Sequence, residues 1–303
     1  MYSNGSVGAR QVRRRLSPEA VARGRLLLAL APALAVVVFL FLGGWGLGLA
    51  GSLGYQPWLD QTQLSLAAYT NLLGRSDFLA SLGLTLWIAS VSTALSSVLA
   101  LAGALFLRRL VWGRRWATFA FQLNLPIPHS VGAIAMLLLL GQSGFLARLG
   151  RLAGLIETPA DFPALIFDPL ALGVILEYSW KATTFIGVNV LAALLALGED
   201  YEATARTLGA GAWQRLRRVV LPLVSPSLAA AAVLSFAFAF GAFEAPFLLG
   251  QRYPSALPVL AYRSYVDVDL NARPEAMAIS MVITAVTTLA VLLYMRFARR
   301  RAV

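Results

Sequence analysis

Long apolar runs recur along the chain and are separated by shorter polar segments. The first run covers residues 26–49 and would rise about 36 Å as a helix, enough to cross a bilayer. Five further runs have similar length and character: 79–107, 116–140, 169–197, 223–249 and 276–297. The pattern therefore predicts an all-α integral membrane protein with six transmembrane helices.

The charged residues between these runs predict the orientation of the chain. With the N-terminus placed inside, 18 of the 25 Lys and Arg residues and four acidic residues fall in inner segments. Six basic and eight acidic residues fall in outer segments. Because positive residues gather on the cytoplasmic side, both termini are predicted to be cytoplasmic. Residues 1–25 then form a basic cytoplasmic tail, and residues 26–303 form the membrane domain.

Composition removes several function classes. The chain has no cysteine and one histidine, His129, so thiolate chemistry is excluded and a metal site or bound cofactor is not expected. The net charge of +11 is explained by the inner arginines, and no nucleic-acid motif accompanies them. The lipid bilayer, rather than nucleic acid, is the expected partner.

The inner segment 198–222 divides into two short predicted helices. Asp200 is suited to begin the first helix, in which Tyr201, Ala205 and Leu208 share one face. Gly209 stands where a left-handed residue ends a helix. This pattern predicts a compact helical segment with an apolar patch, which suits docking into a groove of a cytoplasmic partner.

The same segment resembles the cytoplasmic signature of type I ABC importer permeases. That signature has Glu-Ala-Ala, three residues, Gly, nine residues, Ile, one residue and Leu-Pro. Nine residues follow Gly209, Val219 then stands at the Ile position, and after Val220 come Leu221 and Pro222 at the Leu-Pro position. The Glu-Ala-Ala positions hold Ala203, Thr204 and Ala205, so the family glutamate is absent there. Glu202, one residue earlier, is a candidate substitute.

The resemblance covers about residues 76–297 and implies the type I ABC importer permease fold. It implies cytoplasmic ATP-binding subunits carrying ATP and Mg, a second permease, identical or different, and an extracytoplasmic substrate-binding protein. The location implied is a bacterial inner membrane. The branch that it most resembles imports polyamines, ferric iron or thiamine. The only lysine, Lys181, lies within a predicted span, so the chain has no lysine-containing phosphate loop of its own.

Charged residues within spans are costly and become candidates for the substrate path. Glu177 and Lys181 are four residues apart, so they are read either as a self-neutralising helix pair or as path residues. Glu244, near the outer end of the fifth span, either faces the path or reaches the outer interface. His129 follows the Pro126–Pro128 break, so it either bonds backbone groups freed by the break or lines the path.

The two glutamates and the acidic outer face favour a cationic substrate, while sugars and anions stay open. A secondary transporter or channel that works alone is the alternative function. It predicts internal repeats, which are not visible in the sequence. A membrane-embedded enzyme would need clustered catalytic groups, and these are also not visible.

Overall fold

The computed structural model describes residues 18–57, 62–110, 112–198 and 200–301, and their regular secondary structure is entirely helical. Six helical stretches in this part of the chain are long and apolar enough to cross a membrane, which confirms the predicted number of spans. The chain divides into two units, Met1–Gly48 and Leu49–Val303. Most of α1 (Pro18–Ser52) lies in the first unit. The predicted tail 1–25 lies outside the described residues except for 18–25.

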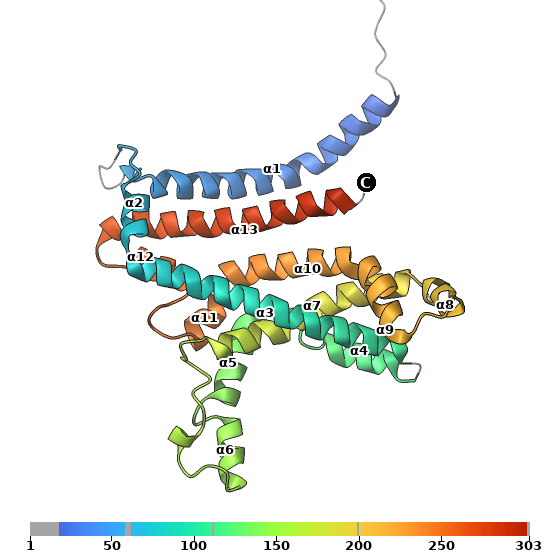
Figure 1. Cartoon of the computed structure of the whole chain (residues 1–303). Helices are drawn as coiled ribbons and strands as arrows, with labels where there is room; N and C mark the ends of the chain where they lie inside the picture. The colour runs from blue at the N-terminus through green and yellow to red at the C-terminus, as the bar shows by residue number, and fades with distance from the viewer. Residues whose placement is uncertain (1–17, 58–61, 111, 199, 302–303) are drawn as a thin grey trace, which may run out of the picture. The chain divides into compact units, whose positions relative to one another are not determined.

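Three long helices form the centre of the second unit. They are α3 (Ser76–Arg109), α7 (Leu172–Ala196) and α10 (Leu221–Gly241), and they pack on one another (Figure 1). The side chains that α3 buries form a stripe of mostly small residues at three- and four-residue spacing: Ser81, Thr85, Ala89, Ser92, Ser96, Ala100 and Ala104. Small residues allow close helix approach inside a membrane, where packing rather than the hydrophobic effect holds helices together.

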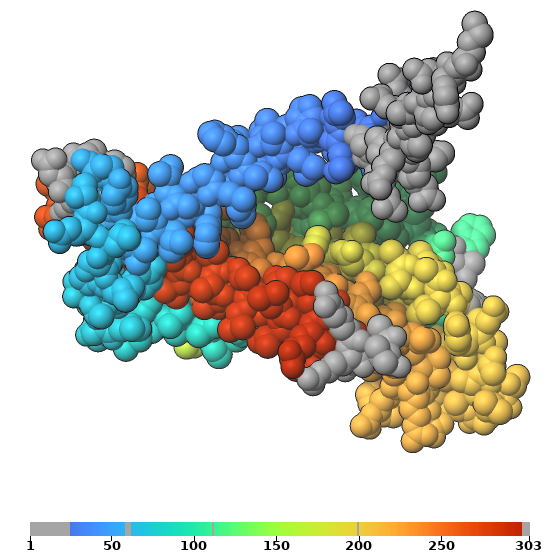
Figure 2. All heavy atoms as spheres, turned by 90° about the horizontal axis from the view of Figure 1, so that it is seen from above, coloured from blue at the N-terminus to red at the C-terminus, as the bar shows by residue number. Residues whose placement is uncertain are grey.

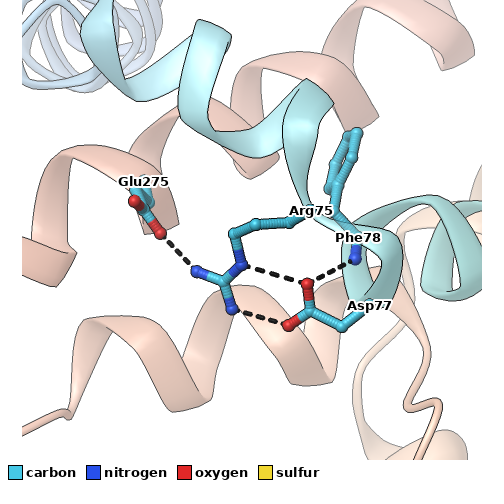
Figure 3. Close-up of polar contacts among 4 residues, drawn as sticks. All are labelled: Arg75, Asp77, Phe78 and Glu275. Atoms are coloured by element: carbon cyan, nitrogen blue, oxygen red, sulfur yellow. Dashed lines mark hydrogen bonds and ion pairs between the residues drawn. The ribbon is translucent and has the colours of Figure 1, made fainter.

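The end of the unit that is predicted to be extracytoplasmic is built from α2 (Ala67–Gly74), α12 (Leu257–Tyr265), the turn η4 (Leu270–Ala272) and the start of α13 (Arg273–Arg301). The helix α2 is short and ends directly before α3. Beside it, the Arg75 guanidinium binds Asp77 at 3.0 and 2.6 Å and Glu275 at 2.6 Å (Figure 3). Its hydrogen bonds to Asp77 raise the pKa of Arg75, and the ion pairs join the start of α3 to the start of α13.

The third apolar run is broken, and the predicted span 116–140 is wrong. Its residues form α4 (Arg114–Gln122) and α5 (His129–Leu140), separated by turns that contain Pro126 and Pro128. Proline lacks a backbone N–H and disfavours helix in the residue before it, so the break follows from the sequence. The stretch long enough to cross a membrane is His129–Leu152, which combines α5 with α6 (Phe145–Leu152). The turn η2 (Pro159–Asp161) follows in the connection to α7.

The fifth apolar run is also interrupted. The helix α10 ends at Gly241, and α11 (Glu244–Leu249) begins after a short break, so the predicted span 223–249 is not one helix. Before α10, the inner segment folds as α8 (Asp200–Thr207), α9 (Ala212–Arg215) and the π-helical turn η3 (Leu216–Val220). Pro222 stands in the first turn of α10, where its missing N–H costs little.

Thr85 connects α3 to α12 through a buried hydrogen bond, and this bond can be tested. Its Oγ1 accepts from the Leu257 N–H at 2.8 Å and donates to the Ser81 carbonyl at 2.7 Å. Thr85→Val keeps the shape but leaves a buried N–H without its partner, which costs about 1–3 kcal/mol of stability. We expect a lower unfolding midpoint for the purified chain in detergent. Thr85→Ser retains the hydroxyl and should unfold near the wild-type midpoint. A wild-type midpoint in Thr85→Val would show that the hydrogen bond contributes little to stability.

Candidate functional site

A cavity of about 380 Å³ lies between α3, α7, α10 and the break before α5. Six side chains with polar groups line it: Ser92, Thr93, His129, Tyr178, Lys181 and Ser235. The remaining lining is apolar and includes Phe185 and Phe238. Polar groups at this depth of a membrane protein mark candidate solute pathways, because lipid cannot solvate them.

Lys181 stabilises the break in the third apolar run. Its Nζ donates to the Asn124 carbonyl at 2.6 Å and to the Ile127 carbonyl at 2.5 Å, and its side chain is only 8% exposed. In addition, the Asn124 side-chain amide donates to the Trp180 carbonyl at 2.9 Å. The carbonyl groups freed by the break thus receive an ammonium donor from α7.

His129, rather than Lys181, is the partner of Glu177. Its Nδ1 lies 3.1 Å from Oε1 of Glu177, whose side chain is 0% exposed. A Cβ at residue 132 would lie 2.9 Å from this same oxygen, so Gly132 leaves the room that the carboxylate occupies. In the described structure, Glu177 and Lys181 form no ion pair with each other. Of the two interpretations offered for each residue, the self-neutralising helix pair and the bonding of His129 to the freed backbone groups are therefore not seen in the described structure.

Three buried oxygens at or beside the cavity lack hydrogen-bond partners among the described residues: Oε2 of Glu177, the Tyr178 hydroxyl and Oγ1 of Thr93. The His129 ring packs against Phe238 with centroids 4.6 Å apart and against Tyr178 at 6.2 Å. The structure thus brings together three of the four predicted path residues, Glu177, Lys181 and His129.

Glu244 is the fourth predicted path residue, and it is separate from the cavity lining. It is exposed at the start of α11. Tyr178 and Phe238 were not among the predicted site residues. An aromatic residue within a long apolar run does not show in the sequence whether it faces a cavity, another helix or lipid.

The segment α8–α9 forms the second candidate site and projects from one end of the unit (Figure 2). Tyr201 is 58% exposed and Leu208 is 83% exposed, while Ala205 of the predicted patch is half-buried. Trp213 is 68% exposed, which the sequence analysis did not predict. Gly209 has φ +82°, confirming the left-handed conformation predicted for it.

Glu202 is bound within the chain. Its Oε1 lies 2.6 Å from the Arg108 guanidinium at the end of α3, and both side chains are largely covered. Ala203 and Thr204, at the positions of the family motif, are exposed instead. Leu221 and Pro222 begin α10 directly after the segment. The ion pair therefore joins the projecting segment to a central membrane helix.

The helical architecture is that of ABC importer permeases. One chain of the crystal structure of a bacterial ABC transporter involved in the import of the acidic polysaccharide alginate superposes with a TM-score of 0.76. The alignment covers 93% of this chain and 98% of the other at 20% identity, which shows the shared fold. The binding-protein-dependent transport system inner membrane component family matches residues 96–303, more than half of the chain, so the chain belongs to this family.

Two curated relatives have different substrates in their names. The sulfate transport system permease protein CysT of Escherichia coli (strain K12) is 29% identical over 247 residues, covering 80% of this chain and 86% of the relative. The trehalose transport system permease protein SugA of Mycobacterium tuberculosis (strain H37Rv) is 29% identical over 227 residues, covering 69% and 71%. The relatives therefore do not single out the polyamine, iron and thiamine branch.

The family establishes the general activity. The chain is a multi-pass permease subunit of an ABC importer, and ATP is hydrolysed by a separate ATPase subunit.

Substitution of Lys181 tests whether its ammonium group stabilises the break between α4 and α5. Lys181→Met leaves the Asn124 and Ile127 carbonyls without their donor, and each buried unsatisfied group costs about 1–3 kcal/mol. We expect a markedly lower unfolding midpoint in detergent. Lys181→Arg keeps donors at this position and should recover part of the loss. A midpoint that does not change in Lys181→Met would contradict the structural role.

Proposed function

We propose that the chain is a bacterial inner-membrane permease that imports a small oxyanion, with α8–α9 as its ATPase contact and the His129 cavity as part of its solute path. The proposal for coupling rests on the exposed side chains of Tyr201, Leu208 and Trp213. Large apolar groups on a projecting cytoplasmic segment favour contact with a protein partner, because exposed apolar patches mark interaction sites.

The Arg108–Glu202 ion pair supports a mechanical role for this segment. A partner that moves α8 also moves Glu202, and the 2.6 Å pair joins Glu202 to the last turn of α3. The helix α3 continues from there to Ser92 and Thr93 in the cavity. Movement of docked ATPase subunits is thus passed to the solute path through one long helix. In this proposal Glu202 positions the segment rather than contacting the ATPase.

The cavity chemistry favours an anion. Its lining contains the basic groups Lys181 and His129 and several hydroxyl groups, but neither Glu177 nor Glu244. Lys181 already donates two hydrogen bonds and retains a third N–H, while His129 retains its second ring nitrogen. Such donors suit a tetrahedral oxyanion. The sulfate permease relative supports the same class.

A cation such as a polyamine, ferric iron or thiamine is the second candidate substrate. The observation in its favour is Oε2 of Glu177, which is buried beside the cavity and has no hydrogen-bond partner among the described residues. In the complete importer, an extracytoplasmic binding protein would present the solute, and a second permease would supply the other side of the path.

Gly209 tests the coupling segment. A Cβ at this position meets no atom within 4 Å, so substitution acts only through the backbone conformation at φ +82°. Valine strongly resists this conformation, at a cost of about 1–3 kcal/mol, whereas asparagine tolerates it. We expect Gly209→Val to lose most ATPase co-purification and uptake while still inserting in the membrane, and Gly209→Asn to retain both. Normal ATPase assembly in Gly209→Val would remove α8–α9 from the coupling mechanism.

Substitution of Glu244 distinguishes an oxyanion substrate from a cationic one. The experiment uses the complete importer in proteoliposomes and compares ATP-driven uptake of sulfate, molybdate, spermidine, ferric iron and thiamine. We expect oxyanion uptake, changed by no more than about twofold in Glu244→Gln because the residue is exposed outside the cavity. The cation hypothesis instead predicts cation uptake that falls by roughly an order of magnitude when this carboxylate is removed.

A further inference from the structure

A second cavity, of about 470 Å³, lies where the end of α3 meets the segment α8–α9 and the turn η3. Four arginine side chains line it: Arg108, Arg109, Arg206 and Arg215. Glu202 is the one carboxylate in the lining formed by the described residues. This basic cavity is distinct from the solute cavity at His129. Arg206 and Arg215 lie on α8 and α9, but the large apolar side chains proposed to contact the ATPase do not line the cavity.

The charges of the basic cavity are not balanced by its own lining. Glu202 pairs with Arg108 at 2.6 Å, which leaves three guanidinium groups without a carboxylate among the described lining residues. Arg215 donates from Nη1 to the Ala210 carbonyl at 2.9 Å. Its Nε is buried and has no hydrogen-bond partner in the described structure. Converging like charges repel one another, so an anion in the cavity relieves both the repulsion and the unsatisfied donor.

The position of the basic cavity indicates the kind of anion. Arg108 and Arg109 form the last turn of the membrane helix α3, and Val220 immediately precedes α10. The cavity thus lies at the predicted cytoplasmic surface of the bilayer, at the depth of the phospholipid phosphates. Its wall also contains Leu105 and Leu216, so apolar surface adjoins the guanidinium groups. Arginine forks match the oxygens of a phosphate group especially well.

We propose that the basic cavity binds a phosphate group, supplied by an anionic lipid headgroup or by free phosphate. A phosphate held between Arg109 of α3 and Arg206 of α8 acts beside the Arg108–Glu202 pair and holds the projecting segment against the membrane helix. The binding itself does not depend on the proposed oxyanion substrate or on ATPase docking, although its consequence for transport rests on the proposed coupling route.

Binding is measured on the purified full-length chain in phosphatidylcholine nanodiscs. One arm adds inorganic phosphate, and the other replaces part of the phosphatidylcholine with phosphatidylglycerol. The unfolding midpoint and the lipid retained in native mass spectrometry are recorded in both arms. We expect a saturable rise in midpoint in at least one arm, and the arm identifies the source of the phosphate.

The variant Arg109→Gln/Arg206→Gln removes two exposed lining charges, so the fold should persist. We expect its apparent affinity to fall at least about tenfold. Arg217→Gln is the matched control, because Arg217 is exposed on η3 but does not line the cavity. Glu202→Gln frees Arg108 and should strengthen binding. Equal responses in the wild type, the double variant and the control, or no gain in Glu202→Gln, would overturn the assignment. Lost phosphate binding in the double variant, with unchanged uptake by the complete importer, would instead contradict only the coupling route.

Discussion

The hydrogen bonds from the Lys181 ammonium to two backbone carbonyls allow a broken helix to persist inside an apolar protein. Lipid offers no hydrogen bonds, so irregular backbone at membrane depth must be satisfied by the protein itself. The prolines at 126 and 128 create such backbone, and Lys181 supplies the missing donor from α7. Because Lys181 is used in this way, Glu177 is left to His129. These hydrogen bonds fix the positions of Lys181 and His129, the two basic side chains that line the cavity.

The helix α3 connects the two candidate sites, the cavity at His129 and the segment α8–α9. Its small buried side chains bring it close to its neighbours, Ser92 and Thr93 line the solute cavity, and Arg108 holds Glu202 near the other end. A long helix transmits displacement along its axis because its backbone hydrogen bonds are all internal. The family defines the chain as an importer permease, and through α3 the described contacts link α8 to the lining of the cavity.

Apolar run length predicted the number of spans, but it could not predict where two of those runs are interrupted. Residues 116–140 are apolar throughout most of their length, yet the stretch that can cross the membrane begins only at His129. The prolines signal this break, whereas the break between Gly241 and Glu244 has no proline and no comparable signal. The local conformation of Gly209 was predictable because a left-handed helix end is a property of a few adjacent residues.

The sequence by itself determined that the chain is a membrane protein, how many spans it has, its family and the presence of a two-helix inner segment. These features depend on composition, on the length of apolar runs and on short spacings. Only the tertiary structure decided which charged groups meet. Spacing along one helix favoured a Glu177–Lys181 pair. Instead, Glu177 pairs with His129, 48 residues away in the chain, and Lys181 donates to carbonyl groups 57 and 54 residues away. Likewise, Arg108 covers Glu202 across the gap between α3 and α8. A buried charge takes the partner that best satisfies it in three dimensions, and local spacing does not record that choice.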